Sequence, residues 1–165
     1  MAEDQQPARV AALVWGVKHS FRNYVEAAGG ATETAAGAER AEDGAFVFAA
    51  APDSDLHLDA AGAPRGTGRF LGEVRFQAHG GMLAVFLADP VLEIGPSGAV
   101  LTIADTSARN RRVEVARLDL AAAAPGETGG LALPATILMD GMFWLGDHYP
   151  PGTPLDPVRL APGPS

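Results

Sequence analysis

The chain changes from strand to helix within eleven residues, Trp15-Gly16-Val17-Lys18-His19-Ser20-Phe21-Arg22-Asn23-Tyr24-Val25. On a helix with about 3.6 residues per turn, one stripe is apolar apart from a single tyrosine; it contains Val17, Phe21, Tyr24, Val25 and Ala28. Ser20 lies beside this stripe, one turn before Tyr24. The opposite side is polar, with Lys18, His19, Arg22, Asn23 and Glu26. We therefore expect the ring of Tyr24 to lie against a core or pocket, where its hydroxyl needs a hydrogen-bond partner.

The rest of the chain predicts short strands joined by turns, because 20 glycines and 13 prolines interrupt it. The clearest strand spans Arg69–Ala78, in which large apolar and polar residues alternate. Gly80-Gly81 follows as a turn and Met82–Ala88 returns, so the two segments predict a β-hairpin. Further strands are predicted at Arg9–Trp15, Ala45–Ala49, Asp55–Asp59, Val91–Ile94, Ala99–Ala104, Val113–Leu120 (with a bulge near Ala116) and Leu131–Met139.

Other stretches lack a strand pattern. Residues 31–44 predict a long loop, Ala121–Gly130 a flexible connector, and the proline-rich end from Pro150 onward a lid or tail on the surface. Asp140–Gly146 predicts a second short helix. We therefore expect a mostly-β fold of two packed antiparallel sheets, similar to a β-sandwich, with one short functional helix near the N-terminus. Residues 8–160 are expected to form a single domain, with flexible ends at 1–7 and 161–165.

Composition excludes several classes of function. The net charge of −8 argues against nucleic acid and against anionic membranes as partners, since a phosphate-binding face needs clustered Lys and Arg. No apolar run approaches the roughly 18 residues of a membrane helix. The chain has no cysteine, which removes disulfides, thiolate metal sites and cysteine nucleophiles. The polar start Met1–Pro7 is not a secretory signal, so the sequence as written predicts a cytoplasmic protein, while the absence of cysteine leaves the compartment open.

Four stretches, in this order, resemble the HtaA-type haem-binding domains of bacterial haem-uptake systems. They are W-G-V-K-H-S-F-R-N-Y from Trp15, G-A-F-V-F from Gly44, F-L-G-E-V-R-F-Q-A-H-G-G-M-L from Phe70 with A-D-P from Ala88, and L-G-D-H-Y-P-P-G-T-P-L-D-P-V from Leu145. Together they reach from about residue 10 to about residue 160. The resemblance implies reversible, noncovalent haem binding for acquisition or transfer. It also implies a secreted or cell-surface setting and a further haem-transfer protein or transporter component as a partner.

In this resemblance Tyr24 takes the place of the iron ligand. Without cysteine, the haem ligands that remain are His, Met and Tyr, and an anionic tyrosine oxygen favours ferric haem. His79 matches the family's histidine partner of the tyrosine, where a neutral imidazole that accepts from the hydroxyl would strengthen the iron–oxygen bond. A tyrosine with only a structural hydrogen bond, and a hairpin histidine that faces solvent, are the alternatives.

The remaining candidates are less well defined. Ser20 is expected to bond a haem propionate or, alternatively, a helix carbonyl. At the C-terminal match the family carries an aromatic residue that packs on the porphyrin, and Phe143 or Trp144 could take this role. His148 stands where the family leads us to expect a phenylalanine. The face of haem opposite Tyr24 is therefore expected to be either apolar or to meet an imidazole.

Two other classes of function stay open. One is an interaction module that binds a protein or another apolar ligand without haem. The other is a small hydrolase or isomerase using Asp147 and His148. The serines lack the context of an activated nucleophile, and the chain has no phosphate loop, dinucleotide fingerprint or two-histidine zinc helix. We therefore expect a binding protein, not an enzyme.

Overall fold

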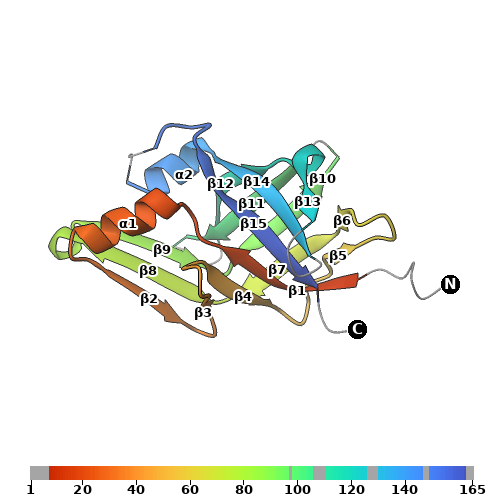
Figure 1. The fold of residues 1–165 in the computed structure, drawn as a ribbon, viewed down its shortest axis with the longest axis horizontal. Coiled ribbons are helices and arrows are strands. Elements are labelled where there is room, and N and C mark those ends of the chain that lie inside the picture. Colours follow the sequence, from red (N-terminus) through yellow and green to blue (C-terminus); the bar gives the residue numbers. More distant parts are fainter. Residues whose placement is uncertain (1–7, 97, 106–110, 126–129, 147–148, 163–165) are drawn as a thin grey trace.

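The computed structural model describes residues 8–96, 98–105, 111–125, 130–146 and 149–162 (Figure 1). Strands dominate these ranges, and the two α-helices in them are α1 (His19–Ala27) and α2 (Met139–Trp144). The mostly-β class and the second short helix are thus confirmed. Helix α1 ends where the glycines predict, with Ala28 as its C-cap and Gly29 at a positive φ of 74°. None of the helices in the described ranges is long and apolar enough to cross a membrane.

Eight of the described strands close into a barrel. They follow the order β4, β7, β10, β11, β12, β14, β15 and β1, and β1 pairs with β4 to complete the ring. Their bounds are β1 (Ala8–Trp15), β4 (Phe46–Ala50), β7 (Thr67–Leu71), β10 (Val91–Gly95), β11 (Gly98–Ala104), β12 (Arg112–Leu118), β14 (Leu131–Ile137) and β15 (Pro154–Pro162).

The expected pair of packed sheets is therefore wrong for this part of the molecule. In a sandwich and in a barrel alike, each strand buries one face, so alternation along a strand does not distinguish the two. The sheet is a closed barrel because β1 pairs with β15 on one side and with β4 on the other. Eight strands leave an interior that side chains fill, here with large apolar residues that include Leu13, Phe48, Phe70, Leu92 and Leu101.

A separate sheet of three strands extends from the barrel. Its order is β2 (Ala31–Ala35), β8 (Glu73–Ala78) and β9 (Leu83–Ala88). The hairpin predicted from the sequence is confirmed, since β8 and β9 pair from Glu73↔Ala88 to Ala78↔Leu83. The segment Arg69–Ala78 is divided at Gly72, whose φ of 142° lets the chain leave β7 in the barrel and enter β8 in the smaller sheet.

Short elements complete the described chain. The strands are β3 (Glu39–Arg40), β5 (His57–Leu58), β6 (Pro64–Arg65) and β13 (Ala124–Pro125), and single 3₁₀ turns lie at His79–Gly81 and Leu120–Ala122. The predicted bulge in β12 is confirmed by a register shift where Leu101 faces Ala116 and Thr102 faces Glu114.

All three segments predicted to lack strands contain them. Within Ala121–Gly130, β13 pairs with β14 and a 3₁₀ turn ends at Ala122. Residues 31–44 contain β2 and β3, and β2 was missed because this edge strand is exposed at nearly every residue and so has no alternation. The end from Pro150 is not a surface tail, because β15 lies between β14 and β1 in the barrel. Its Pro157 falls where pairing with β14 is irregular, between Leu155 and Val158. Ala161 and Pro162, assigned to a flexible end, pair with β1.

Helix α1 lies between the two parts of the fold. Phe21 packs edge-on against Phe76 of β8, with ring centroids 5.1 Å apart. Helix α2 contacts β12, and its Trp144 stacks on Trp15 at the end of β1, with ring centroids 6.2 Å apart. As a result α2 lies near the N-terminal end of α1, and the closed end of the β8–β9 hairpin lies near its C-terminal end (Figure 1).

Candidate functional site

The structure brings Tyr24 and His79 into direct contact. The Tyr24 hydroxyl oxygen lies 2.6 Å from Nε2 of His79, across 55 residues of sequence. The two rings are tilted by 58°, with centroids 5.7 Å apart. Tyr24 is 40% exposed, so its hydroxyl is not sealed in the core as the apolar stripe suggested. The neighbours of Tyr24 in that stripe, Phe21 and Val25, are buried and hold the helix against the sheet.

His79 reaches the tyrosine because it lies in a turn and not at the end of a strand. Its φ is +55°, and Gly80 and Gly81 follow with φ of 66° and 94°. Alternation continued from β8 would put His79 on the side of Arg75 and Gln77, but it does not apply to a residue in this turn. Gly30 adds to the approach: a Cβ there would collide with the carbonyl oxygen of Gln77, so this glycine lets the end of α1 lie against β8.

The two side chains can exchange a proton. When the imidazole is neutral with its proton on Nδ1, Nε2 accepts from the Tyr24 hydroxyl; with the proton on Nε2, the imidazole donates to the phenol oxygen instead. A tyrosine hydroxyl beside a base is suited to give its proton to that base when a cation binds the oxygen. At 2.6 Å the contact lies at the short end of the range for hydrogen bonds.

Ser20 points to a different tyrosine. Its hydroxyl oxygen lies 3.2 Å from that of Tyr149, and either atom can donate. Tyr149 also lies under the ammonium group of Lys18, which is 5.5 Å from the ring centroid. Ser20 is exposed and one turn from Tyr24, so the helix presents two hydroxyl-bearing positions on one side.

Large apolar side chains are exposed in the hairpin turn and on α2, near the two ends of α1. Met82, in the hairpin turn after His79, is 91% exposed, and Met139 and Phe143 of α2 are each 60% exposed. Trp144 is tied down, since its indole N–H donates to the carbonyl oxygen of Phe86 at 2.9 Å. Of the two aromatic candidates, Phe143 is thus the more exposed. His148 and Asp147 lie outside the described residues.

A cavity of about 880 Å³ lies next to α2. Its walls come from β8, β9, β11, β12 and α2, and both aromatic candidates, Phe143 and Trp144, line it. Arg75 and Phe86 form part of the wall, with the guanidinium carbon 4.9 Å from the ring centroid. Tyr24, His79 and Ser20 are not among the lining residues, so the cavity and the tyrosine–histidine pair are separate features.

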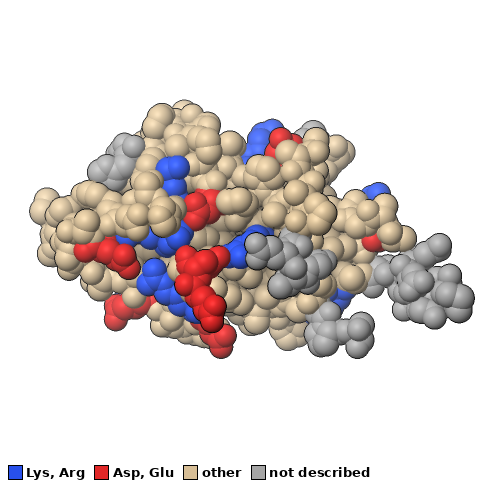
Figure 2. Space-filling model, viewed as in Figure 1, with Lys and Arg blue, Asp and Glu red and all other residues tan. Residues whose placement is uncertain are grey.

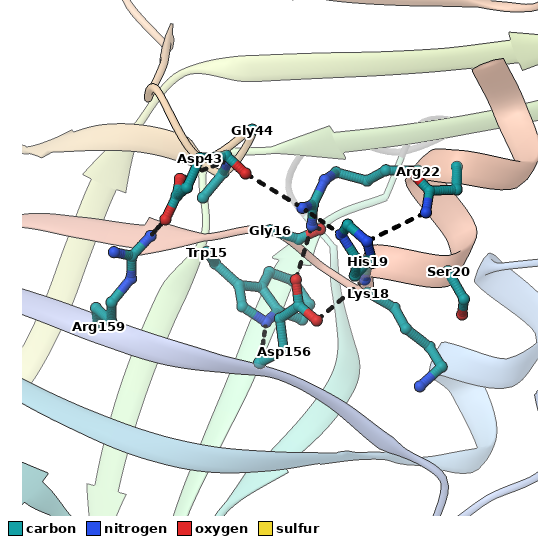
Figure 3. Close-up of polar contacts among 12 residues, drawn as sticks. Trp15, Gly16, Lys18, His19, Ser20, Arg22, Asp43, Gly44, Asp156 and Arg159 are labelled. Carbon is teal, nitrogen blue, oxygen red and sulfur yellow. Dashed lines mark hydrogen bonds and ion pairs between the residues drawn. The ribbon is translucent and has the colours of Figure 1, made fainter.

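The polar side of α1 holds a residue that sequence analysis missed. Arg22, expected among polar residues, is 7% exposed. Its Nη1 donates to the Gly16 carbonyl oxygen and to Oδ2 of Asp156, both at 2.7 Å (Figure 3). Nη2 lies 3.3 Å from Nδ1 of His19, which must accept because a guanidinium only donates. The sequence does not indicate this contact, because Asp156 lies 134 residues from Arg22 and only the fold brings it and Gly16 to the guanidinium.

Charged side chains of both signs gather in one band across the face shown in Figure 2, and most of the remaining surface there is uncharged. Part of the band consists of ion pairs, such as Arg159 with Asp43 at 2.8 Å. Among the described residues no group of three or more His, Cys, Asp or Glu could hold a metal ion.

Comparison with known proteins places the fold. The HtaA (Htaa) family model matches residues 10–161, which is most of the chain. The chain belongs to the HtaA family. The resemblance found in four stretches of sequence is thereby confirmed. No curated protein matches the chain significantly.

Solved structures of HtaA-family domains are similar over almost their whole length. The C-terminal domain of HtaA from Corynebacterium glutamicum is 25% identical, with 95% of this chain and 99% of that chain covered and a TM-score of 0.67. The N-terminal domain of the same HtaA is 22% identical, with 96% and 100% covered and a TM-score of 0.68. Heme binding protein HtaB from the same organism is 17% identical, with 93% and 92% covered and a TM-score of 0.66.

Proposed function

We propose that this HtaA-family domain binds ferric haem noncovalently through Tyr24 and serves in haem acquisition or transfer. The observation that carries the proposal is the exposed Tyr24 hydroxyl, held 2.6 Å from the imidazole of His79. A tyrosine that binds ferric iron as tyrosinate gives up its proton, and a base in contact with the hydroxyl can accept it. Membership in the HtaA family and the fold shared with a heme binding protein, HtaB, support the same conclusion.

The residues around Tyr24 suit haem as a ligand. A porphyrin is flat and apolar with two carboxylates at one edge. Exposed Met82 and Phe143 offer apolar contact, and Ser20 offers a hydroxyl to a propionate. Cysteine is absent from the chain, so a thiolate does not compete with the tyrosine for iron. The bound haem supplies a ferric centre that stabilises the phenolate form of Tyr24.

His79 and Ser20 have separate tasks in this proposal. Nε2 of His79 takes the proton that the Tyr24 hydroxyl gives up, which keeps the oxygen anionic. The turn at Gly80-Gly81 fixes the imidazole in place, because its backbone conformation sets the direction of the His79 side chain. The hydroxyl of Ser20 orients the ligand at its carboxylate edge, and Phe143 packs on the ring. The role is binding and release, with no bond made or broken in the porphyrin.

A hemin titration with two matched variants tests the proposal, because the chain has only two tyrosines. We expect the wild type to saturate at one hemin per chain with the charge-transfer band of an iron–tyrosinate. Tyr24→Phe should lose this band and the specific binding. Tyr149→Phe, which removes the other phenol hydroxyl beside Ser20, should keep both. Unchanged binding by Tyr24→Phe would refute the proposal, and loss of the band in Tyr149→Phe alone would move the ligand to that tyrosine.

The ferric preference has its own measurement. An anionic oxygen stabilises Fe(III) more than Fe(II), so reduction should weaken the bond and speed the handover of haem. We expect faster transfer to an excess of a strong haem acceptor with dithionite than without it. Equal or slower transfer after reduction would point to an imidazole on the iron.

One observation favours a second candidate function. The cavity of about 880 Å³ beside Phe143 is large enough for a small organic ligand and has aromatic and arginine groups in its wall. In this alternative the domain is an interaction module that takes an apolar ligand without haem. Absence of any saturable hemin spectrum, together with binding of an apolar fluorescent probe that Phe143→Ala removes, would favour it.

A further inference from the structure

Helix α1 is held at its N-terminal half by one distant stretch of chain, residues 149–156. Its own N-cap residue, Lys18, makes no side-chain cap. Instead the backbone N–H of His19 donates to Oδ1 of Asp156 at 3.0 Å, across 137 residues. Lys18 Nζ donates to the carbonyl oxygen of Pro154 at 2.7 Å. Asp156 thus supplies, from β15, the acceptor and the negative charge that a helix N-terminus normally finds in its own cap.

Arg22 joins this contact from inside the helix. The two carboxylate oxygens of Asp156 are divided between the His19 N–H and Nη1 of Arg22 (Figure 3). The same Nη1 donates to the carbonyl oxygen of Gly16, at the end of β1, and Nη2 reaches Nδ1 of His19. A Cβ at residue 16 would collide with Nη1, so Gly16 is needed for the guanidinium to fit. One side chain therefore ties α1 to β1 and β15 at once.

The indole of Trp15 completes the attachment of β15. Its Nε1 donates to the Asp156 carbonyl oxygen at 2.8 Å, and the Asp156 N–H donates to the Val17 carbonyl oxygen at 2.9 Å. Asp156 is thus fixed through backbone and side chain together. Its carboxylate is 28% exposed and the Arg22 side chain 9%, so the pair is shielded from solvent more than a surface ion pair.

We propose that Arg22 and Asp156 are positioning residues for Tyr24, and that β15 thereby sets the geometry of the haem site. The inference rests on the proposed function. A helix of nine residues is marginal by itself, so its place depends on what holds it. Arg22 and Tyr24 are two residues apart and lie on different sides of that helix. Displacement of α1 by a fraction of an ångström would lengthen the 2.6 Å contact with His79, on which the ligand depends.

The test compares Arg22→Gln and Arg22→Lys with Arg159→Gln. Arg159 is a matched control, because it donates to the side chain of Asp43, whose carbonyl oxygen accepts from Arg22, and so lies beside the same network without belonging to α1. The first readout needs no haem: the ¹⁵N NMR shift of His79 Nε2 in the ligand-free protein, calibrated with Tyr24→Phe, in which the bond is absent. The second readout is hemin affinity with the position of the iron–tyrosinate band, measured below the melting temperature of each variant.

We expect Arg22→Gln to move the His79 signal toward its value in Tyr24→Phe, to shift the band and to weaken hemin binding about 10- to 100-fold. Arg22→Lys should show a smaller change in each measurement than Arg22→Gln. Lysine keeps the positive charge but lacks the planar guanidinium, which donates to several acceptors at once. Arg159→Gln should match the wild type. Wild-type His79 shift and hemin affinity in folded Arg22→Gln would overturn the inference.

If Arg22→Gln does not fold, a more conservative substitution can still test the inference. Asp156→Asn preserves size and the acceptor for the His19 N–H but removes the charge opposite Arg22. A displaced His79 signal in this variant supports the inference, and an unchanged signal overturns it. The experiment distinguishes failure of the positioning role from failure of the proposed function. If the Arg22 and Asp156 variants and Tyr24→Phe all bind hemin normally, tyrosine ligation is refuted. If only Tyr24→Phe loses hemin binding, the positioning role alone is refuted.

Discussion

Helix α1 carries a tyrosine on one side and an arginine on another, and their exposures are the reverse of what residue type suggests. Tyr24 is 40% exposed although its stripe is apolar, and Arg22 is 7% exposed although its stripe is polar. The arginine is surrounded by partners from β1, β15 and α1 itself. The tyrosine hydroxyl meets the imidazole of a turn.

The comparison separates the residue that holds α1 in place, Arg22, from the residue that can react, Tyr24. A buried charge is tolerated where its donors have acceptors, and the acceptors of Arg22 fix the position of the helix. An exposed phenol beside a base contributes little to folding but can react with a cation. Departures from the simple apolar–polar pattern are expected at functional sites, and here both departures lie on the same short helix.

The largest effect on stability is expected at the buried side. Arg22→Met should lower the free energy of unfolding by about 3 kcal/mol, the lower end for removing one partner of a buried pair, because Asp156 keeps some exposure to water. Tyr24→Phe should change it by less than about 0.5 kcal/mol, as is usual for exposed positions. Urea unfolding followed by circular dichroism measures both. Equal losses in the two variants would remove the contrast between the sides of α1.

Much of this fold could be predicted from the sequence, and the exceptions have physical causes. Alternation identified β8 and β9 and their hairpin, because each has one buried face. It could not find β2, which is exposed on both faces, or β15, whose prolines mask a barrel strand. Closure into a barrel was beyond reach, since it depends on which strands pair and not on what each strand contains.

The candidate site, like the fold, could be predicted only in part from the sequence. Tyr24 and His79 were found through the family resemblance, and the structure adds that their side chains touch. Helical periodicity alone placed Tyr24 in the apolar stripe and gave no sign that Arg22 is buried. Its partners, Gly16 and Asp156, are ordinary residues in sequence, and only the fold brings them around the guanidinium.

A second prediction concerns the exposed side. His79→Ala should weaken hemin binding about 10- to 100-fold without abolishing it, because a group that supports a ligand tunes the bond and does not replace it. His57→Ala is the matched control, since this imidazole bonds the Asp55 carbonyl oxygen in a different part of the fold. The measurement is hemin titration at neutral pH. Complete loss in His79→Ala with retention in Tyr24→Phe would exchange the roles of the two residues.

The smallest effect is expected at Asp43, which accepts from Arg159 on the surface beside the buried pair. The pKa of Asp43 lies below its ordinary value of 3.8, chiefly because the backbone N–H of Ala45 donates to it, with Arg159 adding to the effect. The fold therefore favours the ionised carboxylate, which stabilises it above pH 3.8 and ceases to do so as the pH falls through the lowered pKa.

Asp43→Asn should accordingly cost less than about 1 kcal/mol at pH 7, since both side chains of this pair are about half exposed and water screens them. The difference from the wild type should shrink as the pH falls from 3.8 through the lowered pKa, because the wild-type carboxyl becomes protonated over this range and then resembles the amide. Urea unfolding of both proteins at pH 7, 5 and 3 measures this. A cost at pH 3 equal to that at pH 7 would show that the amide disturbs the loop itself. A cost as large as that of Arg22→Met would show that burial is not what distinguishes the two ion pairs.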